Sequence, residues 1–258
     1  MNYKKIKLLY PSLLFLGLLF RVISTVYTID GKTGFINPDF YVPSIILNLL
    51  SVLCIIFVAV AVLYIKTPEI KYTGPGIISA VIAFFVAVLS VIDMLSMKYT
   101  GVYPAWQVAV VRIAGILNAV FFLYIAVCAV LRVKIIPITY IAPLIFCIVK
   151  LVRFFAVTSS ITIITDNVFT ILSYAFLIFF FLEYAFLVNR YMEDFSLKKM
   201  IVYGVLASMF SVISALPRII KLAVDQTAIM HESSYSIAIT LLLGVFSGLI
   251  TVKFFTEQ

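Results

Sequence analysis

Long apolar runs joined by short polar links constrain this chain more than any other feature. Each run has about 20 residues, the length that an α-helix needs to cross a hydrocarbon core about 30 Å thick. Hydrophobic residues make up 64% of the chain and charged residues 12%, whereas about 25% of residues are charged in soluble domains. We therefore expect an integral membrane protein. The predicted spans cover about residues 8–27, 43–65, 75–97, 107–131, 138–157, 168–188, 200–222 and 234–255.

The continuity of these runs predicts an all-α fold, a bundle of eight transmembrane helices, with seven as the alternative count. A membrane β-barrel would instead show alternating segments of about ten residues. Because the links are short, consecutive spans are expected to be antiparallel neighbours. The chain is thus predicted to form one membrane domain over residues 1–258.

Lysine and arginine residues outside the spans predict the orientation of the chain. Eleven lie on the side of both termini, and two, Lys32 and Lys98, lie on the other side. Basic loops stay preferentially in the cytoplasm, so both termini are predicted to be cytoplasmic in a cell membrane. The net charge of +8 then reflects topology, and no nucleic-acid partner is expected. The eleven residues are Lys4, Lys5, Lys7, Lys66, Lys71, Arg132, Lys134, Arg190, Lys198, Lys199 and Lys253.

The predicted span at 138–157 carries two cations, Lys150 and Arg153, in an otherwise apolar sequence. Being three residues apart, they share one helix face, and a charge in hydrocarbon needs a partner, water or a headgroup. With the orientation above, six cations from four spans fall in the outer half of the membrane. They are Arg21, Arg112, Lys150, Arg153, Arg218 and Lys221, and the acidic residues nearest to them in depth are Asp93 and Asp166, with Asp225 just outside.

Two interpretations of these cations remain open. Each long side chain can snorkel separately to the outer headgroups. Alternatively, the spans converge on a basic pocket, open to the outside, in which cations on separate helices attract a carboxylate, a phosphate or a lipid headgroup. Neutral lining would come from Asn48, Ser51, Thr170 and Ser173.

The acidic residues have simpler roles available as well. Asp93 is a candidate ion-pair partner for one of the cations, and Asp166 or Asn167 is placed to cap the span that starts near residue 168. Near the other end of that span, Glu183 is expected to reach Arg190 or Lys198.

Several kinds of chemistry find little support in the sequence. The cysteines, Cys54, Cys128 and Cys147, lie inside spans without metal-ligand spacing, and His231 beside Glu232 is a single loop histidine. No metal or cofactor is therefore predicted. Hydrolase and intramembrane protease motifs are missing, so an enzyme is disfavoured.

Small residues predict where two spans pack closely. Gly244 and Gly248 have the G-x-x-x-G spacing that lets two membrane helices approach each other. Such a contact serves either the bundle itself or a membrane protein partner.

One passage, KLVRFFAVTSSITIITDNVFTILSYAFLIFFFLEYAFLV, combines a basic aromatic span end, a Ser/Thr-rich link and a phenylalanine-rich span. Together with the earlier YTIDGKTGFI, it resembles a family of uncharacterised multi-span proteins from clostridia-type bacteria. The resemblance implies a bacterial plasma membrane and no particular activity.

The leading hypothesis is an outward-facing transporter or binding subunit for an anionic small molecule or a lipid headgroup. An accessory membrane protein that works through helix contacts is the first alternative. A lipid-modifying enzyme acting through His231 or Asp166 is the weakest one.

Overall fold

The computed structural model describes residues 3–29, 36–64, 75–96, 105–158, 164–189, 193–224 and 233–256. Helices dominate these ranges, and eight of them are long and apolar enough to cross a membrane. The predicted all-α fold with eight spans is confirmed, in preference to seven. The helices are α1 (Tyr3–Thr28), α2 (Tyr41–Leu63), α3 (Ile77–Ser96), α4 (Ala105–Leu131), α5 (Ile141–Thr158), α6 (Ile164–Val188), α7 (Glu193–Val224) and α8 (Ser234–Thr256), with short 3₁₀ turns η1 (Pro38–Phe40) and η2 (Pro137–Tyr140).

Two helices begin earlier than their apolar runs. The predicted span at 200–222 belongs to α7, which begins at Glu193, because charged residues such as Glu and Lys are good helix formers even where the sequence is too polar for hydrocarbon. Likewise α6 begins at Ile164. Asp166 and Asn167 therefore lie inside its first turn, and the prediction that one of them precedes the helix as its cap is wrong.

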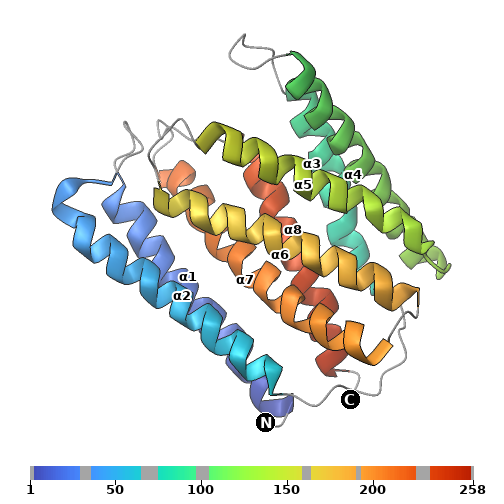
Figure 1. Cartoon of the computed structure of the whole chain (residues 1–258), viewed down its shortest axis with the longest axis horizontal. Helices are drawn as coiled ribbons and strands as arrows, with labels where there is room; N and C mark the ends of the chain where they lie inside the picture. Colours follow the sequence, from blue (N-terminus) through green and yellow to red (C-terminus); the bar gives the residue numbers. More distant parts are fainter. Residues whose placement is uncertain are drawn as a thin grey trace.

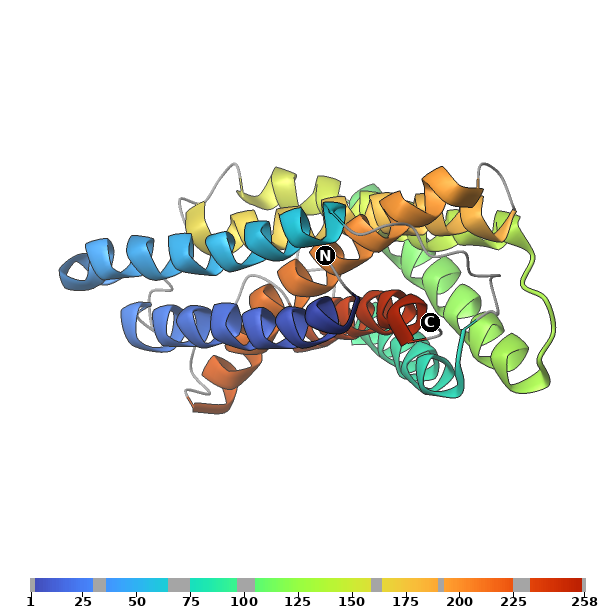
Figure 2. The same cartoon turned by 90° about the horizontal axis from the view of Figure 1, so that it is seen from below.

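The helices run back and forth along one direction, and both termini lie at the same end of the bundle (Figure 1). The hairpin of α1 and α2 flanks one side, and α3 and α4 lie on the opposite side (Figure 2). Between them lie α6, α7 and α8, with α7 contacting α1, α2, α6 and α8. The most apolar window of α7 is 78% buried against 28% for α1, so α7 is the central helix.

Small residues hold α7 and α8 together. A Cβ on Gly244 would lie 2.4 Å from Ser211 Cβ, and a Cβ on Gly248 would lie 2.5 Å from Ser208 Oγ. These contacts explain the G-x-x-x-G spacing, because the two backbones approach only where no side chain intervenes. The glycine face is occupied within the chain and is not available to a separate membrane protein.

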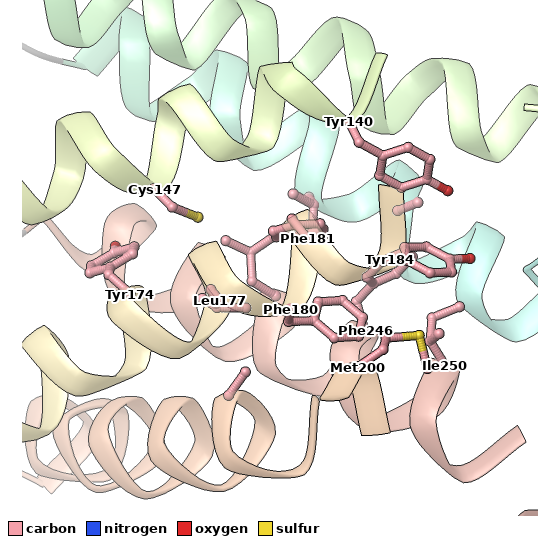
Figure 3. Close-up of a cluster of buried hydrophobic side chains, with 14 of the residues drawn as sticks. Tyr140, Cys147, Tyr174, Leu177, Phe180, Phe181, Tyr184, Met200, Phe246 and Ile250 are labelled. Atoms are coloured by element: carbon pink, nitrogen blue, oxygen red, sulfur yellow. The ribbon is translucent and has the colours of Figure 1, made fainter. Parts of the chain in front are cut away.

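An aromatic cluster that includes Tyr140, Tyr184 and Phe246 is buried between the helices (Figure 3). The rings of Tyr140 and Tyr184 lie 4.9 Å apart between centroids, and Phe122 and Phe246 lie 5.4 Å apart, both pairs edge to face. Buried rings in this geometry gain packing energy and hold no charge. The half of the core nearer to the termini is therefore rich in aromatic rings, and most of the buried charged side chains lie in the other half.

Candidate functional site

Arg21, on the second half of α1, is buried between three helices. Its side chain is 2% exposed, and Nη1 donates a hydrogen bond to Asn48 Oδ1 on α2. The guanidinium carbon lies 4.5 Å from the ring centroid of Phe169 on α6, in a cation–π contact. A buried arginine held by an amide and an aromatic face keeps its full positive charge inside the protein.

A second buried arginine comes from α7. Arg218 is 7% exposed, and its Nη2 donates to Thr170 Oγ1 at 2.6 Å. Arg218 is close enough to Arg21 for the two positive charges to repel each other. Four helices thus bring two guanidinium groups together, and we call Arg21, Asn48, Phe169, Thr170 and Arg218 the arginine site.

Hydroxyl groups surround the arginine site. Ser24, Thr25 and Thr28 follow Arg21 at spacings of three, four and seven residues, so they share its helix face. Ser24 and Ser44 lie 3.2 Å apart between their Oγ atoms, which joins α1 to α2. The Thr25 hydroxyl is buried and has no hydrogen-bond partner among the described residues. This face of α1 is therefore polar and contains at least one unused hydrogen-bonding group.

Lys221 lies one helical turn beyond Arg218 on α7. Its Nζ donates to the backbone oxygen of Ile29 at 2.7 Å, just after α1 ends. Ser211, Ser214, Arg218 and Lys221 are spaced three, four and three residues apart, a spacing that predicts one polar stripe along α7. This stripe is buried along its whole length. Lys221 therefore ties the end of α1 to α7 beside the arginine site.

Lys150 belongs to a different cluster. Its Nζ lies 3.1 Å from Asp93 Oδ2 on α3 and donates to Ser236 Oγ on α8 at 2.9 Å. Ser233 Oγ donates to the other carboxylate oxygen of Asp93. Asp93 is thus an ion-pair partner, as its structural interpretation predicted. We call Asp93, Lys150, Ser233 and Ser236 the ion-pair cluster.

The two remaining predicted cations lie elsewhere. Arg112 is exposed on α4, and Arg153 is partly buried on α5. Both take part in contacts of their own. Of the six predicted cations, then, the structure brings Arg21 and Arg218 together, places Lys221 beside them, and puts Lys150 in a separate ion pair.

The predicted neutral lining divides in the same way. Asn48 and Thr170 hold the two arginines, whereas Ser51 donates to the backbone oxygens of Gly17 and Leu47 at 3.0 Å. Ser173 donates to the backbone of Thr170 at 2.7 Å. Ser51 and Ser173 therefore serve helix packing and helix geometry.

The predictions for Glu183, Asp166 and His231 have different outcomes. Glu183 is paired with Lys199, 3.7 Å away, rather than with Lys198, because Lys198 is exposed on another face of α7; Arg190 lies outside the described residues. The side chain of Asp166 and all of His231 also lie outside them. Their proposed roles are untested.

The sequence analysis missed the polar face of α1 and the partners of the ion pair. Arg21, Ser24, Thr25 and Thr28 have the spacing of residues on one helix face. The rule that predicts the stripe on α7 therefore also predicts this polar face of α1. Phe169 and Ser233 carried no comparable signal, because a phenylalanine in an apolar helix and a serine before one are ordinary in sequence.

The arrangement defines a polytopic helical membrane protein with a buried basic site in one half of its bundle. Comparisons with protein families, with curated proteins and with solved structures found no match. The resemblance to a family from clostridia-type bacteria therefore stays a prediction.

Proposed function

We propose that this protein binds a compact anion at the arginine site, as a transporter or as the binding subunit of a membrane assembly. The binding group would be a carboxylate or a phosphate, either free or carried by a lipid. The excess of basic residues near the termini supports an orientation with the termini in the cytoplasm. The arginine site would then open toward the outside of a bacterial plasma membrane.

One observation carries this proposal: two guanidinium groups from different helices, those of Arg21 and Arg218, lie buried near each other inside the membrane domain. Like charges at short range in a medium of low dielectric constant destabilise the protein. Each also donates a hydrogen bond to a neutral oxygen, Arg21 to Asn48 and Arg218 to Thr170. An anion between the two would reverse the sign of the interaction, and arginine is suited to two-pronged contact with a carboxylate or a phosphate.

The site also carries groups that fit the oxygens of such an anion. Thr25 has a buried hydroxyl with no partner among the described residues, on the same face of α1 as Arg21. A hydroxyl can donate to an anion oxygen, and a buried polar group gains most from being satisfied. The polar face of α1 and the two arginines therefore favour one shared ligand over two separate snorkelling side chains.

Thermal stability in mild detergent tests the proposal. Sulfate, inorganic phosphate, acetate and an anionic lipid are each added, and the melting temperature is measured. A ligand present at about 100 times its dissociation constant stabilises by about 2.7 kcal/mol, which corresponds to roughly 5–10 °C for a chain of this size. A shift with soluble anions indicates a free ligand, and a shift with the lipid alone indicates a headgroup.

Two conservative variants and one matched control make the result specific. Arg21→Lys and Arg218→Lys keep the charge and lose the planar fork, so the shift should shrink by at least about half. Arg112→Gln removes an exposed cation from the same half of the bundle and should leave the shift intact. Equal shifts in all four proteins would mean that the anion binds somewhere else.

Asp166 offers a further arm of the same experiment. It lies four residues before Thr170 in the sequence of α6, and the sequence predicts it as part of the basic site. Removal of a negative charge from a basic site strengthens anion binding, so Asp166→Asn should give a larger shift than the wild type if Asp166 belongs to the site as the sequence predicts. A smaller shift would place Asp166 among the groups that hold the arginines in position.

A further inference from the structure

The central helix α7 contains a proline directly before one of the residues of the arginine site. Pro217 lies inside α7, and Arg218 follows it. A proline has no N–H to donate, so the carbonyl of Ile213, four residues earlier, loses its helical donor, and the proline ring crowds that carbonyl. Sharp bends in helices occur at such positions. The resistance of α7 to bending is therefore lowest beside the arginine site.

The two parts of α7 on either side of Pro217 are packed differently. Before the proline, a Cβ on Gly17 of α1 would lie 3.1 Å from Ile213 Cδ1, and α8 packs more closely still through its G-x-x-x-G face. After the proline come residues 218–224, which we call the end segment. Burial decreases along it, and Val224 is 72% exposed. The first part of α7 is thus fixed between its neighbours, whereas the end segment has room to move.

Hydrogen bonds from two long side chains connect the end segment to neighbouring helices. Arg218 Nη2 donates to Thr170 Oγ1 on α6 at 2.6 Å, and Lys221 Nζ donates to the backbone oxygen of Ile29 at 2.7 Å. Thr170 Oγ1 also lies 2.8 Å from Ser214 Oγ, so one hydroxyl contacts α7 before and after the proline. Both donors lie at the ends of flexible side chains, which can follow a small movement of the backbone.

We propose that α7 bends at Pro217 and that the end segment is a gate for the arginine site; this inference rests on the proposed function, which supplies the ligand. The closed position is that of this structure, in which Arg218 donates to Thr170 near Arg21. In the open position the end segment tilts away from α1 and carries Arg218 and Lys221 with it. An anion then enters from the end of the bundle that lies away from the termini (Figure 1). A bound anion that contacts both arginines favours the closed position.

The expected movement of the end segment is small but measurable. The end segment has seven residues, which corresponds to about 10 Å at a rise of about 1.5 Å per residue. A change of about 20° in the bend at a proline displaces the tip of such a segment by roughly 3–4 Å. Collective motions of helices take microseconds to milliseconds, so frozen samples contain both positions.

Distances between two nitroxide labels, measured by pulsed electron spin resonance in mild detergent, test the gate. Val224→Cys places one label at the tip of α7, and Leu95→Cys places the other near the end of α3; both side chains are exposed. The native cysteines are buried, so the reagent labels the introduced ones. We expect two distances that differ by roughly 3–4 Å. Any of sulfate, phosphate, acetate and the anionic lipid that raises the melting temperature should shift the population toward the closed position.

Three controls make the result specific. Pro217→Ala restores the missing N–H and should leave a single distance, whereas Pro11→Ala removes the internal proline of α1 and should keep both distances. Labels at Tyr41, the exposed first residue of α2, and at Leu95 leave out the end segment and should give one distance with and without sulfate. The response to sulfate in the wild-type background and the Tyr41 control do not depend on whether Pro217→Ala folds.

The possible failures of the gate and of the proposed function are distinguishable. A single distance that sulfate does not change, or two distances that persist in Pro217→Ala, overturns the gate and leaves the proposed function standing. An anion that raises the melting temperature without shifting the populations has the same meaning. If the three anions and the lipid change neither the melting temperature nor the populations, both the gate and the proposed function are overturned.

Discussion

The arginine site and the ion-pair cluster are both buried and charged, yet they are built on opposite principles. In the ion-pair cluster, Asp93 cancels the charge of Lys150 directly, at 3.1 Å. In the arginine site, two cations, Arg21 and Arg218, lie near each other and donate hydrogen bonds to Asn48 and Thr170. The first pairs two opposite charges, and the second brings two like charges near each other.

The difference shows why a count of cations does not locate a binding site. A lysine with a carboxylate beside it has little attraction left for an anion, whereas the proposed function requires that the two arginines on different helices retain theirs. Variants that remove a charge from either region, or that disturb a contact elsewhere in the bundle, test this contrast. The largest effect is expected at the ion pair.

The strongest test breaks the ion pair. Lys150→Met leaves the Asp93 carboxylate buried without its cation, and we expect a loss of about 3–5 kcal/mol in the free energy of unfolding. The double variant Lys150→Met/Asp93→Asn should recover most of that loss, because no lone charge remains. Equilibrium unfolding in mixed detergent micelles measures both, and a double variant as unstable as the single one would contradict a balanced pair.

A second test disturbs the helix contact that lies between the two regions. Gly244→Ala would put a Cβ 2.4 Å from Ser211 Cβ, between α8 with Ser236 and α7 with Arg218. Overpacking of this kind costs about 1–3 kcal/mol. The matched control is Gly115→Ala on α4, whose Cβ would meet its nearest neighbour at 3.9 Å. The control should gain up to about 1 kcal/mol from helix propensity.

The third test removes a charge from the arginine site. Arg218→Met loses a hydrogen bond to Thr170 but also relieves the repulsion with Arg21, and Thr170 keeps Ser214 at 2.8 Å. We expect the free energy of unfolding to change by less than about 1 kcal/mol. The same unfolding assay applies. A loss as large as that of Lys150→Met would indicate that Arg218 is charge-balanced in the same way as Lys150.

The smallest effect is expected from a pair at the edge of the bundle. Glu183 and Lys199 are 3.7 Å apart, and the lysine side chain is 40% exposed. Ion pairs that solvent screens contribute about 0–1 kcal/mol, so Glu183→Gln should change the free energy of unfolding by less than that. A larger loss would show that the half of the bundle near the termini also depends on a buried charge.

Much of the fold follows from local pattern. Apolar runs of membrane length predicted all eight spans, and the 3-4-3 spacing on α7 predicted a polar stripe that is indeed buried. The helix starts at Glu193 and Ile164 were missed, since hydropathy reports the extent of hydrocarbon and not the extent of a helix. The G-x-x-x-G spacing predicted a close contact but not whether its partner was in the same chain.

The sequence by itself determined that the chain is a multi-span helical membrane protein and which residues are charged within its spans. It did so because the cost of exposing backbone and charge to hydrocarbon depends on composition and helical period alone. Only the tertiary structure decided that Lys150 pairs with Asp93 while Arg21 lies near Arg218. Those pairings join residues 57 and 197 positions apart, 150 − 93 and 218 − 21, and they depend on which helix faces turn toward each other.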